Sequence, residues 1–475
     1  MPETRGWLPG AALAVGLITA ARLSALWFDR TDLYVDEAQY WLWGRNLDFG
    51  YYSKPPLIAW VIRLVTTLAG SDAAFWVRLP GALLHGATAL ILGTLGARLD
   101  GARTGFWVAI GYATLPFVAL GSLLISTDTV MAPAFAAALL FHHRAVETGQ
   151  GRHAALAGVM AGLAIMAKYA GAYFLLGAGL AALFVPQMRL GRRNGALLIL
   201  GVALVVLPNL IWNAAHGFAT FAHTADNAGW LRSGVRLAAL NPGELARFFL
   251  AQFAVFGPVL FAALLWGYLR PGAGKARALV WFSAPVLGLV CVQALLTHAY
   301  ANWAVAAYFP GVLIAVPLLL ARAPRLFGVS LALNGAICLS LPLLTITAPA
   351  PERNGKPLLS RYIGQGALSR QILDLAAVSG ARGIAASDRA VLADLFYTGR
   401  DAGIAVYAVA PRGRAMNYYE ETFPLPDDAG EVLLVTARAP ACAGAARDLD
   451  TADGAYAGRA LAAYLVRADC ANAAR

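Results

Sequence analysis

Charged residues are scarce in this chain. Of its 475 residues only 13% are Asp, Glu, Lys or Arg, 59% are hydrophobic, and the mean hydropathy is +0.61. A soluble globular protein carries about 25% charged residues. The composition therefore excludes an ordinary soluble fold for most of the chain and indicates an α-helical polytopic membrane protein.

Acidic residues are the scarcer charge, and their distribution divides the chain. Residues 1–348 hold 23 Lys or Arg but only 12 Asp or Glu, whereas residues 349–475 hold 14 of each. The net charge of +11 thus belongs to the apolar part. Basic loops that set membrane orientation explain this excess, so we infer no nucleic-acid partner. We predict a transmembrane domain at 1–348 and a separate C-terminal domain at 349–475.

The sequence also lacks a signal-peptide cleavage site, a heptad array, a solenoid repeat and a low-complexity tract. The opening apolar run is long enough to span a bilayer, and no small-residue cleavage site separates it from the charged stretch that follows. We therefore expect an uncleaved first helix. In total eleven transmembrane helices are predicted, at roughly 8–28, 76–97, 105–125, 129–143, 154–167, 169–186, 195–213, 245–269, 278–296, 304–321 and 327–348.

The basic residues predict an orientation for these helices. With the N-terminus inside, the inner segments carry thirteen Lys or Arg and only three acidic residues, as the positive-inside rule requires. The loop at 29–75, the turn near 297–303 and the C-terminal domain then lie outside. The C-terminal domain alternates helical patterns at 368–378 and 389–399 with strand patterns at 383–387, 404–409 and 431–437, which is typical of a small α/β domain.

Only four cysteines occur. Cys291 and Cys338 lie within apolar runs and are interpreted as small buried hydrophobic residues. Cys442 and Cys470 lie in the polar domain, 28 positions apart. If that domain faces an oxidising periplasm, paired cysteines usually bridge, and we predict a Cys442–Cys470 disulfide. Two unrelated free thiols are the alternative.

Two acidic residues and a lysine occur beside the first apolar run. Asp36 and Glu37 begin a stretch, at 36–60, that contains Lys54-Pro55-Pro56. Its aromatic residues suit helices that lie in the plane of the membrane interface, and Arg45 and Asp48 are interpreted as the solvated side of such a helix. These aromatic and apolar residues are Tyr40, Trp41, Trp43, Leu47, Phe49, Tyr51 and Tyr52.

Three more polar motifs fall on the same predicted outer side. "STD" at 126–128 contains Asp128, "AKYAG" at 167–171 contains Lys168, and "THAYANW" at 297–303 contains His298 and Asn302. Two of them have a structural alternative: Asp128 as the N-cap of a helix, and Lys168 as a side chain that snorkels to the interface. His298 alone would be unremarkable. Together, carboxylates and lysines at one interface suit an anionic lipid headgroup and a hydroxyl that a carboxylate deprotonates.

The stretch "DEAQYWLWGRNLDFGYYSKPPLIAW" resembles the first outer loop of the C-type glycosyltransferases that use polyprenyl-phosphate sugars. It is similar to the branch of protein O-mannosyltransferases and lipid A aminoarabinose transferases. With "STD", "AKYAG" and "ANWAVAAY", it looks closest to galacturonosyltransferases of lipid A and lipopolysaccharide core. The resemblance covers most of residues 30–310; the tail resembles the family in position and in "NYYEETFPL" at 417–425.

The resemblance implies roles for individual residues. Asp36 would be the base that takes the proton of the acceptor hydroxyl, with Glu37 supporting it, and Asp128 would complete a carboxylate cluster. Lys54, with Tyr52 beside it, would meet the donor phosphate. The remaining residues would line the cavity: Lys168, His298 and Asn302. The resemblance also implies a multi-pass protein of the bacterial inner membrane with a periplasmic active site.

The sequence limits the classes of sugar and acceptor but does not identify either one. Where the lipid A aminoarabinose enzymes carry Glu-Lys-Pro, this chain has Ser53-Lys54-Pro55. A carboxylate at the position of Ser53 would bind a cationic sugar. Because this chain has none there, an acidic or neutral sugar fits better. The acceptor is expected on lipid A, lipopolysaccharide or another envelope glycoconjugate. No spacing of His, Cys and Glu amounts to a metal site, and metal dependence stays open.

Three function classes remain to be compared. An inverting transferase acting by single displacement is the leading hypothesis, with protein O-mannosyl transfer as its near alternative. A flippase or transporter of polyprenyl-linked sugars would also hold intramembrane charges, but at the midplane and with inverted halves. A receptor or assembly scaffold would not need the paired carboxylates.

Overall fold

The computed structural model describes residues 6–230, 240–272 and 274–473. Its chain forms two compact units, each built from several segments of the sequence. The first unit contains Met1–Leu26, Lys54–Val61 and Arg78–Pro342, and the second contains Trp27–Ser53, Ile62–Val77 and Leu343–Arg475. The predicted boundary near residue 348 lies close to Leu343, but the second unit also includes most of the first outer loop.

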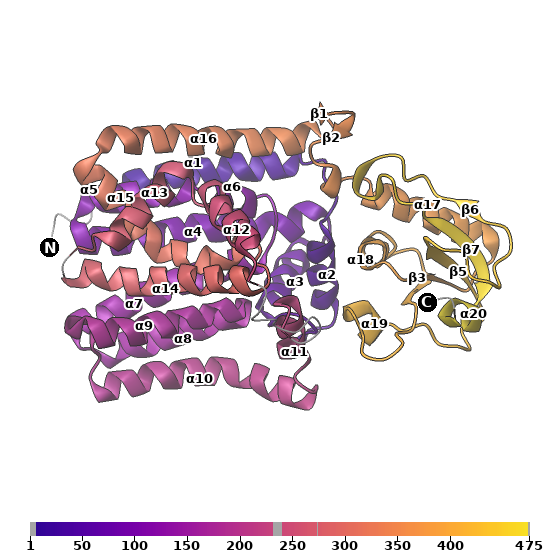
Figure 1. Cartoon of the computed structure of the whole chain (residues 1–475), viewed down its shortest axis with the longest axis horizontal. Coiled ribbons are helices and arrows are strands. Elements are labelled where there is room, and N and C mark those ends of the chain that lie inside the picture. The colour runs from indigo at the N-terminus through magenta and orange to yellow at the C-terminus, as the bar shows by residue number, and fades with distance from the viewer. Residues whose placement is uncertain (1–5, 231–239, 273, 474–475) are drawn as a thin grey trace. The chain divides into compact units, whose positions relative to one another are not determined.

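The first unit is entirely helical in its described residues (Figure 1). Helices α1, α3, α4 and α16 each cross the division between the units. The helices that lie wholly or partly in the first unit are α1 Leu8–Trp27, α3 Leu57–Ala69, α4 Ala74–Asp100, α5 Ala102–Ala113, α6 Pro116–Gly121, α7 Thr127–Thr148, α8 Gly151–Ala167, α9 Tyr173–Phe184, α10 Arg192–Ala215, α11 Ala219–Asn227, α12 Pro242–Val255, α13 Pro258–Leu269, α14 Gly274–Leu296, α15 Tyr308–Arg322 and α16 Pro324–Thr347.

Six of the described helices are long and apolar enough to cross a membrane, and counting α12 with α13 makes a seventh. The fold is that of a polytopic helical membrane protein, as predicted. The other predicted spans correspond to shorter or less apolar helices, so the number eleven rests on the sequence alone. Four parts of the sequence prediction fall partly outside the described residues. They are the inner N-terminus, at 1–5; the segment between the predicted helices 195–213 and 245–269, at 231–239; the segment between the predicted helices 245–269 and 278–296, at 273; and the C-terminal domain, at 474–475.

Two segments predicted as single helices are broken, and both breaks have a proline. The segment 105–125 divides into α5 and α6 before Pro116, and the segment 245–269 divides into α12 and α13 before Pro258. The second pair is bent by 114°, and Gly257 there has φ +86°. Proline offers no N–H to the preceding turn and disfavours helical geometry in the residue before it.

Close helix packing in the first unit depends on glycine. Helices α7 and α8 pack together, as do α8 and α10 (Figure 1). At the second contact a Cβ added to Gly158 would lie 2.1 Å from the carbonyl oxygen of Leu198, which is nearer than any real side chain approaches. Small residues let apolar helices approach closely where the hydrophobic effect does not drive their association.

The second unit contains a mixed α/β sheet region at its C-terminal end. The predicted strands and helices of this region are confirmed: β3 Gly383–Ala386, β4 Ala405–Ala408, β5 Glu431–Thr436, α17 Gln365–Ser379 and α18 Arg389–Thr398. Elements that the sequence patterns did not predict are β1 Glu352–Arg353, β2 Lys356–Pro357, β6 Arg447–Asp448, β7 Ala462–Arg467, α19 Tyr418–Thr422 and α20 Ala468–Ala473.

The five-stranded sheet has the order β4-β3-β5-β7-β6. Strands β4, β3 and β5 run parallel, with Ile384 opposite both Val406 and Leu433, whereas β7 pairs antiparallel to β5 and to β6. Strands β3 and β5 are buried along almost their whole length, which is typical of strands covered on both faces.

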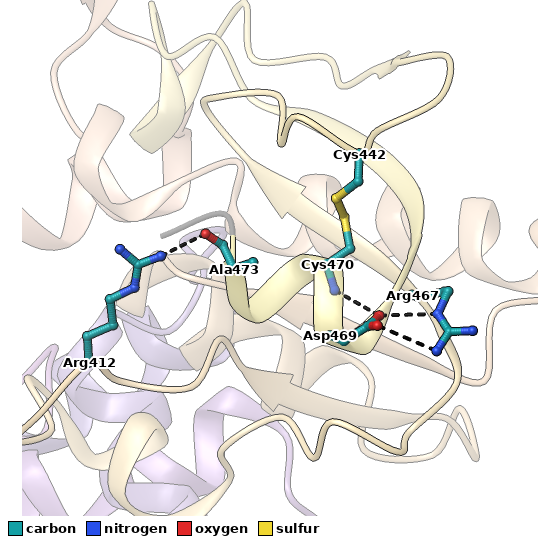
Figure 2. Close-up of a disulfide and its surroundings, with 6 residues drawn as sticks. All are labelled: Arg412, Cys442, Arg467, Asp469, Cys470 and Ala473. Carbon is teal, nitrogen blue, oxygen red and sulfur yellow. Dashed lines mark hydrogen bonds and ion pairs between the residues drawn. A yellow bond between two sulfur atoms is a disulfide. The ribbon is translucent and has the colours of Figure 1, made fainter.

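The predicted disulfide is present. Cys442 and Cys470 are bridged with their Cα atoms 6.3 Å apart (Figure 2). Cys470 lies in α20, which follows β7, and Ala473 at the end of that helix accepts a hydrogen bond from Arg412 at 2.7 Å. The bridge therefore fastens the end of the described chain to the sheet region. The other two cysteines, Cys291 and Cys338, are free and half-buried.

Candidate active site

A polar cluster in the first unit joins three of the predicted site residues. The Nζ atom of Lys168 donates to both carboxylate oxygens of Asp128 at 2.8 Å, and the amide Nδ2 of Asn302 donates to one of them at 2.9 Å. We call these three residues the Asp128 cluster. The side chains of Lys168 and Asp128 are 15% and 11% exposed, so the charges are largely withdrawn from solvent and each needs its partner.

The start of α7 places Asp128 in this cluster. Ser126 is the N-cap, and its hydroxyl oxygen accepts a hydrogen bond from the backbone N–H of Thr129 at 3.2 Å. The alternative in which Asp128 itself caps the helix is therefore wrong. Since a neighbouring hydroxyl satisfies the helix end, the Asp128 carboxylate is available for longer-range contacts.

The "AKYAG" motif forms a sharp junction between two helices. Lys168 has extended geometry, with φ −157° and ψ 135°, between the end of α8 and the short 3₁₀ helix η1, Tyr169–Ala172. A Cβ added to Gly171 would lie 2.4 Å from the backbone carbon of Ala164, so only glycine permits this tight return. This junction directs Lys168 to Asp128, so the lysine has a protein partner for its charge.

The fourth motif contributes one of its two predicted residues to the cluster. Asn302 lies in the 3₁₀ helix η3, Ala301–Ala307, which precedes α15. The ring of His298 packs against Tyr300 and Trp303, with centroids 5.6 and 6.0 Å apart. No hydrogen bond described for the first unit joins that ring to the Asp128 cluster.

A second polar cluster lies in the second unit, around the predicted base. The guanidinium Nη2 of Arg389 donates to Oδ1 of Asp36 at 2.5 Å, and its Nε donates to Oε1 of Gln39 at 3.0 Å. We call these residues the Asp36 cluster. The side chains of Arg389 and Asp36 are 39% and 45% exposed, so the carboxylate is open to a ligand.

The helix that carries Asp36 is α2, Val35–Arg45, and its first turn is acidic. Glu37 is 2% exposed, and its Oε2 accepts a hydrogen bond from the backbone N–H of Tyr34 at 2.9 Å. This contact closes the start of the helix in the manner of a capping box. Arg45 at the other end donates to Asp72 at 3.3 Å. Of the two adjacent acids, Asp36 is the accessible one.

The aromatic residues near α2 are covered by protein. Trp43 is fully buried, stacked on Tyr51 at 4.6 Å and edge-on to Tyr418 at 5.8 Å, and Trp41 meets Tyr397 edge-on at 5.1 Å. The rings of Trp41, Trp43 and Tyr51 are thus packed against protein, and the prediction that α2 lies in the plane of the membrane interface stays a prediction. Their rings suit burial against the C-terminal segment equally well, and a sequence pattern does not separate the two environments.

The two remaining predicted donor residues lie close together in the chain. Tyr52 is 7% exposed and donates its hydroxyl to the backbone oxygen of Ala415 at 3.0 Å. Lys54 is half-buried in the bend that precedes α3. Within the described residues no group of three or more His, Cys, Asp or Glu gathers as a metal would require.

Arg389 is the functional candidate that sequence reasoning missed. It follows Asp388, whose carboxylate accepts hydrogen bonds from Ala390 and Val391 and so caps α18. The helix start could be predicted from the sequence, but the partner of Arg389 lies 353 positions away. No local pattern points to it.

A family model matches part of the chain, and a known relative matches nearly all of it. Residues 53–212 match the model of the dolichyl-phosphate-mannose-protein mannosyltransferases. The chain is 41% identical over 474 residues to the lipid A galacturonosyltransferase RgtD of Rhizobium johnstonii, covering 97% of this chain and 98% of that protein.

The fold is shared with solved structures, two of which cover nearly the whole chain. These two are the crystal structures of ArnT from Cupriavidus metallidurans, one bound to undecaprenyl phosphate and one in the apo state, with TM-scores of 0.67 and 0.62. Each is 14% identical to this chain, and each match covers 97% of this chain and 98% of ArnT. The match to the mannosyltransferase family model, the RgtD identity over nearly the whole chain and the shared helical fold lead to one conclusion: this chain belongs to the C-type (GT-C) membrane glycosyltransferases of the dolichyl-phosphate-mannose-protein mannosyltransferase family.

Proposed function

We propose that this protein transfers a galacturonosyl residue from a polyprenyl-phosphate carrier to lipid A, at the periplasmic face of a bacterial inner membrane. The observation that carries the proposal is the 41% identity to a lipid A galacturonosyltransferase across 97% of this chain and 98% of that protein. The crystal structure of ArnT bound to undecaprenyl phosphate supports a polyprenyl-phosphate carrier for the same fold.

The proposed reaction is a single displacement that inverts the anomeric carbon. The acceptor oxygen attacks that carbon, the bond from carbon to phosphate oxygen breaks, and polyprenyl phosphate leaves with the bonding electrons. Asp36 takes the proton of the acceptor, and Lys54 binds the phosphate on which negative charge develops. The burial of Glu37 and its contact with Tyr34 support an indirect role for that residue, which holds the start of α2.

The other predicted residues act in binding. In the Asp128 cluster, one carboxylate holds the ammonium group of Lys168 and the side-chain amide of Asn302. We assign this cluster, with His298 from the same motif as Asn302, to the lining of the substrate cavity. Tyr52 supports the loop that leads to Lys54. A uronate sugar fits because Ser53, and not an acidic residue, precedes that lysine.

Purified protein in detergent, supplied with synthetic polyprenyl-phosphate galacturonate and lipid A, tests the proposal. We expect release of free polyprenyl phosphate and a lipid A product heavier by one hexuronate residue in mass spectrometry. Polyprenyl-phosphate mannose and a hydroxyl-rich peptide serve as the competing donor and acceptor. Transfer to the peptide in place of lipid A would contradict the proposal. The flippase alternative is tested with the protein reconstituted in liposomes, where movement of the donor between leaflets without its cleavage would indicate a flippase.

The Asp36→Asn variant tests the proposed base. The amide keeps an oxygen that accepts from Arg389, so folding is expected to be normal, but it cannot take up the proton, and nearly all transfer is lost. Asp48→Asn is the matched control in the same loop, because Oδ1 of Asp48 accepts a bond from the neighbouring Phe49 N–H that an amide oxygen also accepts. Near wild-type turnover of Asp36→Asn would remove Asp36 from the mechanism.

A further inference from the structure

We propose that Arg389 is a positioning residue for Asp36, and that the C-terminal segment takes part in transfer through this side chain. The inference rests on the proposed role of Asp36 as the base. It assigns a function to a segment that the predicted domain division treats as a separate domain.

The guanidinium holds two groups on one face of α2. Asp36 and Gln39 are three positions apart, and Arg389 donates through different nitrogen atoms to an oxygen of each. The bond to Gln39 fixes the plane of the guanidinium, and the bond from Nη2 then fixes Oδ1 of Asp36. A lysine ammonium, which lacks this planar fork of donors, would not hold both partners in the same geometry. Among the described hydrogen bonds, none engages Oδ2 of Asp36, so that oxygen can accept the proton of the acceptor while Oδ1 stays bound.

The helix that carries Arg389 is itself fastened to the outer loop. At its far end Tyr397 packs edge-on to Trp41 and donates its hydroxyl to the backbone oxygen of Asp72 at 2.8 Å. Helix α18 is therefore in contact with α2 at both of its ends. A residue on such a helix has little freedom to move away from Asp36.

The same unit offers a second arginine with a comparable contact. Arg361 donates to the hydroxyl of Tyr34 at 2.8 Å and lies over that ring, with its guanidinium carbon 5.6 Å from the ring centroid. Tyr34 immediately precedes α2. Arg361 thus links the C-terminal segment to the same helix without any described contact to Asp36, which makes it the matched control.

The expected effects follow from geometry. A misplacement of a catalytic group by about 1 Å costs about 100-fold in rate, so we expect Arg389→Gln to lower kcat about 10- to 100-fold with little change in KM for the donor. Arg389→Lys keeps the charge but not the two-point contact, and partial activity is expected. Arg361→Gln should stay within about 2-fold of wild type, since it removes only a docking contact.

The decisive test is a double-substitution cycle in the full-length protein. If Arg389 acts through Asp36, Arg389→Gln should have no further effect on the residual rate of Asp36→Asn, because interacting residues are non-additive. Added guanidinium ion should restore part of the activity of Arg389→Ala and none to Arg361→Ala. Thermal unfolding of each variant shows whether it is folded. If Arg389→Gln is not folded, Arg389→Lys, which keeps the charge and the side-chain stem, takes its place in the cycle.

Two results would overturn the inference. One is an equal loss of kcat in Arg389→Gln and Arg361→Gln, which would assign Arg389 to docking alone. The other is a full, additive loss in the Asp36→Asn background. Because the rates are measured with whichever polyprenyl-phosphate sugar wild type uses, an error in the proposed sugar is recognised separately.

Discussion

The Asp128–Lys168 pair should be strongly coupled in stability, and its geometry sets the size of the effect. Nζ lies 2.8 Å from both carboxylate oxygens, and the side chains are only 11% and 15% exposed. At an effective dielectric of about 20, two charges at that distance attract by about 6 kcal/mol before desolvation is subtracted. Removing one partner of a buried pair costs about 3–5 kcal/mol, because the other charge is left without compensation.

We therefore expect Asp128→Asn and Lys168→Met each to lower the free energy of unfolding by about 3 kcal/mol. The double variant should lose only about 1 kcal/mol, since the asparagine still accepts from Asn302 and methionine fills the volume of the lysine stem. Equilibrium unfolding in mixed detergent and dodecyl sulfate micelles, followed by tryptophan fluorescence, measures all three values.

The first unit supplies a matched control for this cycle. Arg98 and Glu147 join α4 to α7 at 2.6 Å, but their side chains are 31% and 32% exposed. Exposed pairs are worth less than about 1 kcal/mol, so a cycle on this pair should give a small coupling. If the Asp128–Lys168 losses add to within about 0.5 kcal/mol, the reasoning from burial is refuted. A double variant that regains stability without activity would identify the cluster as functional.

Three further predictions concern the donor, pH and the lysine junction. Lys54→Ala should weaken use of the lipid-phosphate donor and Lys54→Arg should retain part of it; unchanged donor kinetics in both would exclude the phosphate role. Burial raises the pKa of Asp394 from 3.8 to about 6, although hydrogen bonds to its carboxylate act in the opposite direction. Between about pH 4 and 6 the folded protein therefore keeps a proton on Asp394 that the unfolded chain has lost. Stability should therefore fall as pH rises through that window, by up to about 3 kcal/mol; thermal unfolding of Asp394→Asn should match wild type near pH 4 and exceed it near pH 7. Gly171→Ala should lower the unfolding temperature and transfer together because of the 2.4 Å approach, whereas Gly179→Ala, with nothing within 4 Å, should do neither.

The sequence predicted what depends on local pattern. Strands β3, β4 and β5 and the disulfide followed from periodicity and composition. Asp128, Lys168 and Asn302 were predicted on one side of the membrane, and the structure joins them by hydrogen bonds. The bend between α12 and α13 was missed although a signal for it was present: Gly257 is followed by Pro258, a dipeptide that marks turns. Strand β7 was missed because its pattern, at 462–467, did not stand out without its partner β5.

The sequence could not predict contacts between side chains that are far apart in the chain. The rings of Trp41, Trp43 and Tyr51 suit a lipid interface and a protein interior equally well, and only the fold shows that Tyr397 and Tyr418 cover two of them. Arg389 is a surface arginine by every local criterion, and its partner is 353 positions distant.

The same distinction explains why composition and packing divide the chain differently. Charge and hydropathy change near residue 348, and the end of the membrane part was predicted from that change. The division into compact units depends on contacts between residues instead. By that measure Trp27–Ser53 and Leu343–Arg475 belong to one unit. The acid proposed as the base thus belongs, by packing, to the unit that carries the C-terminal sheet. A polar domain at the end of a membrane enzyme can accordingly be part of the catalytic apparatus even when no motif within it resembles a catalytic one.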